Sequence, residues 1–116
     1  MSVAGMPVAR QDFVLYRGTD QGIDVRWRRD LLDGSPPQPV NLLGREGVCV
    51  LTGGPQEREL LRRHCRMTSD GHAIADIPAA ALTDKVFDRI TTGKWRITLA
   101  WSGRTRLLGW GFWTLA

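Results

Sequence analysis

Apolar and polar residues alternate most regularly over residues 94–101. Every second position there carries a large apolar side chain, namely Trp95, Ile97, Leu99 and Trp101. A period of two is typical of a β-strand with one buried face, so this stretch predicts such a strand. Ser102-Gly103 follows as a turn dipeptide, and residues 105–116 predict the return strand of a hairpin. Because four of the five tryptophans lie in this hairpin, we expect it to form the centre of the core.

The return strand of this hairpin is apolar on both faces. A two-residue turn sets Trp101 opposite Arg104 and Trp95 opposite Trp110. On that register the core face carries Leu108, Trp110 and Phe112, and the opposite face carries Leu107, Trp113 and Leu115.

A strand face of this kind is an aggregation hazard when it is exposed, and a repeated subunit removes the hazard by packing against neighbours. We therefore predict that Leu107, Trp113 and Leu115 belong to an interface between subunits. The alternative is that a helix predicted over residues 79–90 covers this face within one chain.

Short apolar stretches separated by turn signals fill the rest of the chain. β-Strands are predicted over residues 12–16, 23–28, 47–52 and 73–77, with a short extended piece at 40–44. Residues 57–67 fit a helix by propensity, but we choose a strand because it closes a hairpin with 47–52. The turn spacing predicts an all-β antiparallel sandwich of about seven or eight strands with one short helix, immunoglobulin-like or jelly-roll-like. A small closed barrel is the alternative.

The composition is that of one ordinary globular domain. The chain has 116 residues, 42% of them hydrophobic and 24% charged. No apolar run approaches the roughly 18 residues that a membrane span needs, so we expect no contact with a membrane. We expect a flexible N-terminal arm over residues 1–10 and a single domain over residues 11–116. The two cysteines, Cys49 and Cys65, are too few for a disulfide framework, so we expect reduced thiols that lie near one another across a hairpin.

Few side chains are arranged for catalysis or metal binding. Cys49, His64, Cys65, Asp70 and His72 match no zinc-ligand spacing, and the adjacent His64 and Cys65 would point to opposite faces of a strand. The sequence has neither a phosphate-binding glycine motif nor a nucleophile with an orienting base. We therefore expect a protein that is not an enzyme and that holds no metal or cofactor.

A run of basic residues is the main charged feature of a chain with a net charge of +4. The run comprises Arg58, Arg62, Arg63, His64 and Arg66, and together with Arg26, Arg28 and Arg29 it could line a groove for a phosphate backbone. A small nucleic-acid-binding β-domain with an oligonucleotide-binding or SH3-like barrel is therefore the alternative function. The tryptophans, however, alternate with polar residues as core residues do. We expect Arg62, Arg63 and Arg66 to contact protein rather than nucleic acid.

Four short motifs follow one another along nearly the whole chain. Residues 12–20 read DFVLYRGTD, residues 40–44 VNLLG, residues 70–78 DGHAIADIP, and residues 93–99 GKWRITL. In this order and spacing they resemble a β-sandwich family from phages of actinobacteria, which includes lower tail fibre modules and other minor virion proteins. Residues 53–63 depart from the family pattern because this stretch is longer and more basic.

The resemblance implies a non-enzymatic structural component of a tailed-phage virion, either a minor tail protein or a capsid-associated protein. Its partners would be other virion proteins and copies of itself in a homo-oligomer. The resemblance also implies a location in the virion, after assembly in the host cytoplasm. The predicted interface residues come from the residue patterns described above, and they are Leu107, Trp113, Leu115, Arg62, Arg63 and Arg66.

Overall fold

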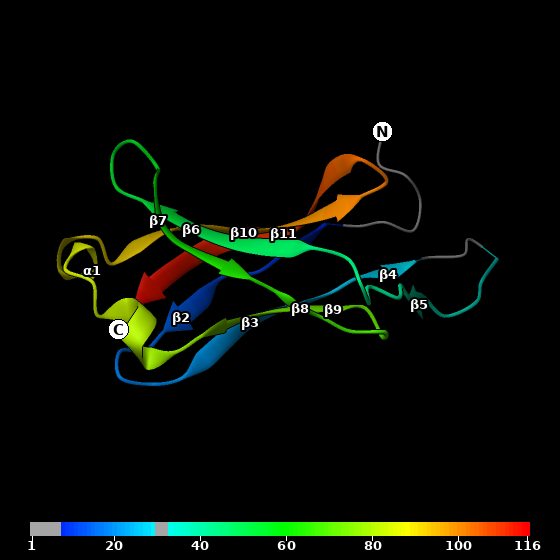
Figure 1. The fold of residues 1–116 in the computed structure, drawn as a ribbon, viewed down its shortest axis with the longest axis horizontal. Coiled ribbons are helices and arrows are strands. Elements are labelled where there is room, and N and C mark those ends of the chain that lie inside the picture. Colours follow the sequence, from blue (N-terminus) through cyan, green and yellow to red (C-terminus); the bar gives the residue numbers. More distant parts are fainter. Residues whose placement is uncertain (1–7, 30–32) are drawn as a thin grey trace.

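Two β-sheets pack face to face, and the predicted hairpin forms the centre of the larger one (Figure 1). A computed structural model describes residues 8–29 and 33–116 of the chain. The larger sheet contains β1 (Ala9–Arg10), β2 (Phe13–Leu15), β6 (Gly47–Gly53), β7 (Arg58–His64), β10 (Thr92–Trp101) and β11 (Arg104–Leu115). The smaller sheet contains β3 (Gln21–Arg26), β8 (Arg66–Met67) and β9 (His72–Ile77), while β4 (Arg28–Arg29) and β5 (Gln38–Pro39) pair as a separate ribbon.

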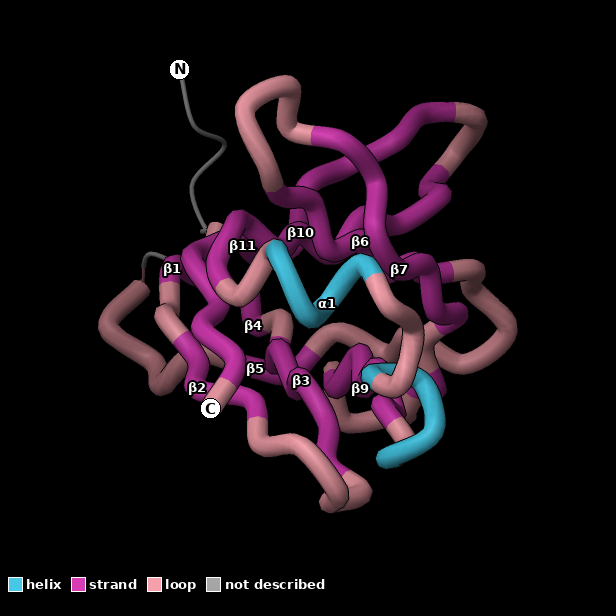
Figure 2. The backbone as a smooth tube through the Cα atoms, turned by 90° about the vertical axis from the view of Figure 1, so that its left-hand side faces the viewer, coloured by secondary structure: helices cyan, strands magenta, loops and turns pink. Residues whose placement is uncertain are grey.

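The sandwich confirms the predicted all-β fold class. The strands outnumber the predicted seven or eight because four of them, β1, β4, β5 and β8, are only two residues long. Two short helices, η1 (Ala79–Leu82) and α1 (Val86–Arg89), lie at the same end of the sandwich (Figure 2). Within the part of the chain that the structure describes, neither helix is long and apolar enough to cross a membrane.

The N-terminal strands add to the edge of the C-terminal strand. The larger sheet has the order β1-β11-β10-β6-β7, and β2 also pairs with β11, further along the same strand. Both of these pairings are parallel, whereas the β10–β11, β10–β6 and β6–β7 pairings are antiparallel. Of the predicted flexible arm, residues 1–7 lie outside the described residues. Residues 9 and 10, which the prediction included in the arm, form β1 and pair with β11.

The C-terminal hairpin contains a β-bulge that shifts its register. Trp101 lies opposite Arg104, as the Ser102-Gly103 turn predicts. Beyond Leu108 the pairing changes, because Thr98 pairs with Leu107 while Ile97 pairs with Gly109. Leu108 is therefore an extra residue in β11, with no partner of its own on β10. The predicted pairing of Trp95 with Trp110 is wrong, since Trp95 lies opposite Gly111.

One extra residue exchanges the two faces of the second half of β11. Trp113 is fully buried and Leu115 is 7% exposed, whereas Trp110 and Phe112 are 37% and 40% exposed. The prediction that Trp113 and Leu115 face away from the core is therefore wrong. Trp113 donates its indole N–H to the carbonyl oxygens of Thr52 (3.0 Å) and Lys94 (3.1 Å), and α1 covers its ring through Phe87, whose centroid lies 6.0 Å away.

The core lies between the inner faces of the two sheets, and the helices close one end of it. Alternating residues of β3, β9 and β10 point into this space because each of these strands has one buried face, whereas β6 is buried along nearly its whole length. The fully buried members with the largest side chains are Leu15, Ile23, Leu42, Leu51, Ile77, Phe87, Trp95, Ile97, Leu99, Leu108 and Trp113.

The strand interpretation of residues 57–67 is confirmed except at Glu57, which lies in the turn, and at Cys65, which separates β7 from β8. β7 pairs with β6 in an antiparallel hairpin, with Val50 opposite Arg62. The chain then crosses to the smaller sheet, where β8 pairs with β9. The extended piece at 40–44 forms no strand, although Val40 and Leu42 are buried in it.

The predicted helix over residues 79–90 is interrupted. Thr83 donates its hydroxyl to the carbonyl of Ala80, and the Asp84 carboxylate accepts from the Val86 N–H at 2.9 Å. Such side-chain hydrogen bonds compete with a helical backbone, so η1 ends before α1 begins.

The RGTD stretch of the first motif fixes this helical segment against the sandwich. Arg17 donates its guanidinium to the carbonyl of Phe87 at 2.8 Å. The Asp20 carboxylate accepts from the Ala79 N–H, also at 2.8 Å. The motif therefore has a structural role, which is to hold both short helices at the end of the core.

Candidate functional site

The outer face of the larger sheet carries an exposed apolar patch, which we call the outer aromatic surface. Its members are Val14 on β2 and Leu107, Trp110 and Phe112 on β11, with exposed fractions of 51%, 41%, 37% and 40%. The two aromatic rings stand edge to face, with centroids 6.1 Å apart. Side chains of this size are normally buried, and the bulge at Leu108 is the reason that these two face outward.

The β1–β2 segment holds the two rings in place. The Arg10 guanidinium lies over both, 5.3 Å from the Trp110 centroid and 5.6 Å from the Phe112 centroid. Asp12 pairs with Arg10 at 3.4 Å, and its carboxylate accepts from the Phe112 N–H at 3.0 Å. Cation–π contacts at exposed sites contribute about 0.5–1 kcal/mol each, so the patch is positioned by several weak contacts acting together.

Charged residues of both signs border the outer aromatic surface. Lys94 forms an ion pair with Glu57 at 2.7 Å, and the hydrogen bond from Lys94 lowers the pKa of Glu57. Further along the sheet, Arg62 pairs with Glu59 at 2.7 Å and likewise lowers its pKa through a hydrogen bond. A hollow of about 210 Å³, lined in part by Glu57, Lys94 and Arg96, opens beside Trp110 and Leu107. The border is therefore polar and carries both signs of charge.

The structure separates the six predicted interface residues. Leu107 lies on the outer aromatic surface, whereas Trp113 and Leu115 lie in the core. Arg62 lies on the same sheet face as Trp110, and two strands separate them, with Arg96 on β10 and Val50 on β6 in between. Arg63 and Arg66 instead meet at Asp76 of the smaller sheet, where Arg63 donates to the Asp76 carbonyl at 3.0 Å and Arg66 pairs with its carboxylate. That contact lowers the pKa of Asp76 and raises the pKa of Arg66.

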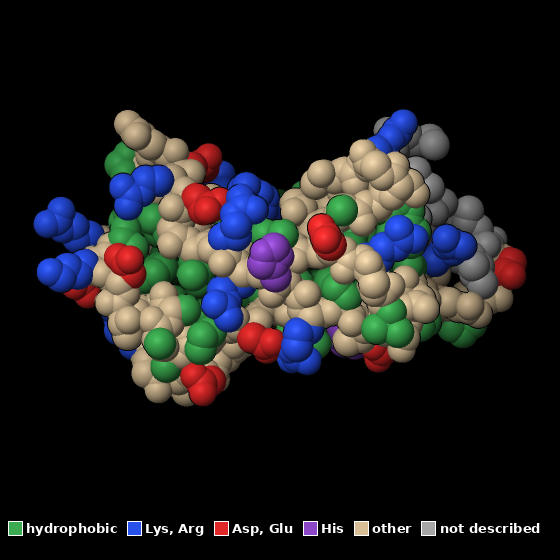
Figure 3. Space-filling model, viewed as in Figure 1, with side chains coloured by type: hydrophobic (Ala, Val, Ile, Leu, Met, Phe, Trp, Pro, Cys, Tyr) green, Lys and Arg blue, Asp and Glu red, His purple; other side chains and the backbone are tan. Residues whose placement is uncertain are grey.

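The basic run does not form a continuous track. Arg62 and Arg66 are engaged by acids, and Arg26 donates to the carbonyl of Asp70 at 3.2 Å. Acidic side chains are interspersed among the basic ones over the face shown in Figure 3. A groove that follows a phosphate backbone needs adjacent cations without such partners.

The thiols and histidines do not form a reactive site. Among residues 8–29 and 33–116, no three His, Cys, Asp or Glu side chains gather as they would around a metal ion. Burial raises the pKa of Cys49 to about 12 and that of Cys65 to about 11. Because a reactive cysteine needs a lowered pKa, both thiols are poor nucleophiles at neutral pH. His72 contacts Asp24 through Nδ1 at 2.8 Å on the outer face of the smaller sheet.

Sequence reasoning missed Trp110 and Phe112 as surface residues. Residues 94–101 of the partner strand alternate between apolar and polar side chains, as a strand with one core face does. The simple hairpin register places Trp110 and Phe112 on that same face. The one available signal is that glycines at 109 and 111 flank Trp110, since glycine inside a strand often marks a bulge or a close backbone approach.

Comparisons with known proteins give a distant likeness in fold. No family model matches the chain, and a search of curated proteins finds no match. Among solved structures, the N-terminal domain of phage TP901-1 ORF48 is similar with a TM-score of 0.48 and 13% identity, over 94% of this chain and 84% of that one. The CupB6 tip adhesin from Pseudomonas aeruginosa is similar with a TM-score of 0.30 and 10% identity, over 97% of this chain and 42% of that one. At these scores and identities neither likeness assigns a function to the chain.

Proposed function

We propose that this protein is a non-enzymatic structural component of a tailed-phage virion, either a minor tail protein or a capsid-associated protein. It works by packing the outer aromatic surface against another subunit. The ordered motifs over residues 12–20, 40–44, 70–78 and 93–99 support the virion class. The observation that carries the mode of action is the pair of exposed aromatic rings on an ordered sheet face.

The composition of the outer aromatic surface is that of an interface core. Aromatic residues and arginine are enriched at protein interfaces, and a few such residues supply most of the binding energy. Trp110, Phe112 and Arg10 are in mutual contact here, and Leu107 and Val14 extend the apolar area. Contiguous apolar area on a β-sheet face marks a contact site or an aggregation hazard.

We propose that a second copy of the chain packs against the outer aromatic surface. The ion pairs on this face, Arg10–Asp12, Lys94–Glu57 and Arg62–Glu59, put both signs of charge on one surface. In an isologous contact about a two-fold axis the same patch meets itself, so a surface that carries both signs can match itself. An acidic or a basic partner would instead favour a patch of one sign.

Light scattering during size-exclusion chromatography tests this proposal. We expect the wild type to form a dimer and the variant Trp110→Ser, Phe112→Ser to be a monomer with an unchanged circular dichroism spectrum. Leu43→Ser is the matched control, because Leu43 is also exposed, at 60%, but lies in a loop away from the patch. A wild type that stays monomeric at its highest soluble concentration contradicts the second copy as the occupant.

A single-stranded nucleic acid is the second candidate partner, and one observation favours it. Exposed aromatic rings beside arginines, here Trp110 and Phe112 with Arg10 and Arg96, are the arrangement on which bases stack. Fluorescence anisotropy with labelled oligothymidylate separates the two functions. We expect no binding at physiological salt. Binding whose log–log salt slope is about −0.7 for each phosphate, lost with Trp110→Ser, would support this second function instead.

A further inference from the structure

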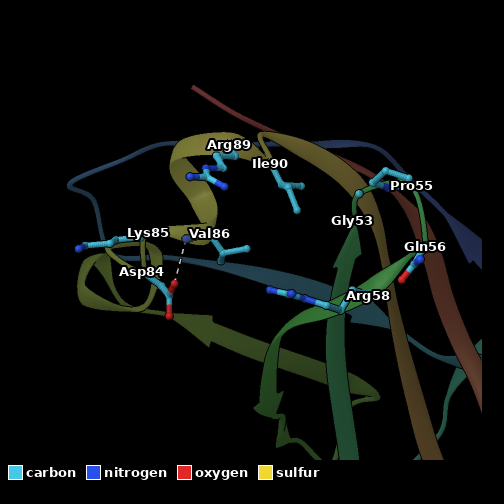
Figure 4. A pocket seen from close by; sticks show the side chains of 10 residues that line it. Gly53, Pro55, Gln56, Arg58, Asp84, Lys85, Val86, Arg89 and Ile90 are labelled. Carbon is cyan, nitrogen blue, oxygen red and sulfur yellow. Dashed lines mark hydrogen bonds between the residues drawn. The ribbon is translucent and has the colours of Figure 1, made fainter.

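A cleft of about 580 Å³ opens between the β6–β7 turn and helix α1 (Figure 4). We call it the turn–helix cleft. Gly53, Gly54 and Pro55 line it on the sheet side, and residues 84–86, 89 and 90 line it on the helix side. It lies at the end of the sandwich where the helices sit, and the residues that line it are not those of the outer aromatic surface.

The inner wall of the turn–helix cleft is aliphatic. Val86 and Ile90 are half-buried and lie on the helix side, opposite Gly53, in Figure 4. The turn packs closely on this wall, because a Cβ at Gly53 would lie 2.7 Å from Cγ2 of Ile90 and a Cβ at Gly54 would lie 3.2 Å from its Cδ1. The two glycines therefore let the backbone of the turn lie against Ile90, while Val86 and Ile90 both stay partly exposed in the lining.

The rim of the turn–helix cleft is basic. Arg58 reaches from β7 towards the helix, and Lys85 and Arg89 lie on the helix side (Figure 4). Within the described part of the chain none of these three forms an ion pair, which distinguishes them from Arg62 and Arg66. Asp84 is the one acid in the lining, and its Oδ1 already accepts from the Val86 N–H at 2.9 Å.

From this arrangement we propose that the turn–helix cleft binds a short acidic and aliphatic segment of a partner protein. An aliphatic side chain of the segment packs on Val86 and Ile90, and its carboxylates pair with Arg58, Lys85 and Arg89. The volume of about 580 Å³ falls in the range of about 300–1,000 Å³ that ligand pockets occupy, which is room for a few side chains.

A peptide fits this cleft better than a nucleic acid does. The lining contains no aromatic ring on which a base could stack, and its inner wall is aliphatic rather than polar. The inference stands independently of the virion role, because it rests on the lining residues of this cleft and not on the outer aromatic surface.

The first experiment uses four fluorescein-labelled probes and the full chain. The main probe is an eight-residue peptide of alternating glutamate and leucine. In the second probe glutamine replaces glutamate, in the third serine replaces leucine, and the fourth is oligothymidylate. We expect the first peptide to bind about tenfold or more tightly than the second and the third, and binding to weaken with salt. Equal affinity of the first two peptides, no binding of the first, or tighter binding of oligothymidylate would overturn the proposal.

The second experiment locates the site. The variant Arg58→Glu, Arg89→Glu should weaken binding of the main probe by about tenfold or more, with an unchanged circular dichroism spectrum. Arg28→Glu, Arg29→Glu is the matched control, because it reverses two exposed charges in β4, outside the cleft. An equal loss in both variants would show general charge attraction and overturn the assignment. The neutral pair Arg58→Gln, Arg89→Gln provides the same comparison if the charge reversal disturbs folding.

Discussion

Gly111 lies directly against the backbone carbonyl of Gln11, so closely that a Cβ at position 111 would be 1.8 Å from the carbonyl oxygen. The same oxygen accepts the indole N–H of Trp95 at 2.8 Å, and the Gln11 N–H donates to the Trp110 carbonyl at 3.1 Å. Gln11 connects β1 to β2. The absence of a side chain at Gly111 therefore allows the N-terminal strands to lie on the edge of β11.

Gly111→Ala should destabilise the protein by about 2 kcal/mol or more, because the new methyl group must displace the backbone of Gln11 rather than a flexible side chain. Urea denaturation followed by tryptophan fluorescence measures the loss. Gly103→Ala is the control, since a Cβ there meets nothing within 4 Å and only the left-handed backbone (φ 73°) opposes it. That control should cost about 1 kcal/mol, so equal losses would contradict the role of Gly111.

Replacement of two tryptophans separates the two faces of β11. Trp113→Ala should lower the free energy of unfolding by about 3–5 kcal/mol, because it empties a core position and removes a bonded indole N–H. Trp110→Ala should cost about 1 kcal/mol or less, since its ring is exposed and contacts mainly Arg10 and Phe112. Thermal and urea unfolding at low protein concentration provide both values. The opposite ranking would mean that the bulge at Leu108 is absent.

Alkylation tests the state of the two cysteines. Both are free thiols in the structure, with Cys49 fully buried and Cys65 partly buried. Iodoacetamide should react slowly with the folded protein at pH 8, because burial raises the pKa of each thiol and so removes the reactive thiolate. After denaturation without reductant, intact mass should show two modified thiols. A mass two units low with no modification would reveal a disulfide.

The raised pKa values also predict how stability changes in alkaline solution. Desolvation raises the pKa of Cys49 from its ordinary 9.0 to about 12, so the folded state favours the protonated thiol. The resulting stabilisation is complete below pH 9 and is lost as the pH rises through about 12. Lysine and tyrosine also titrate in this range, so the measurement compares the wild type with Cys49→Ala. The wild type should lose more stability between pH 9 and 11 than the variant, and parallel pH profiles would contradict the prediction.

The sequence predicted the strands correctly where side-chain alternation and turn residues agree. Ser102-Gly103 gave the correct turn and the correct first pair, Trp101 with Arg104. Residues 57–67 favour a helix by local propensity, yet pairing with β6 makes them a strand. Tertiary contacts decided that segment, and the correct prediction came from looking for a hairpin partner rather than from propensity.

The candidate site could not be predicted because it depends on one unpaired residue. Leu108 and Gly109 are both buried and adjacent, so the alternation over residues 105–116 changes phase in the middle of the strand. A simple period of two therefore assigned Trp110 to the core and Trp113 to the surface, the reverse of the structure. Of the two glycines that flank Trp110, only Gly111 lies against a backbone, that of Gln11 in the same chain, whereas Gly109 faces the side chains of Val25 and Trp95.

The pairing of β1 and β2 with β11 has a consequence for synthesis on the ribosome. Asp12 and Phe112 are hydrogen-bonded although 100 residues separate them, so the strands made early have no sheet to join until β11 has emerged. Phe13 and Leu15 must therefore stay in contact with solvent or a chaperone while the intervening residues are translated. Folding that depends on such distant contacts is slow, of the order of milliseconds to seconds in β proteins. β1 and β2 therefore complete the edge of the larger sheet late, after the C-terminal hairpin has emerged and formed.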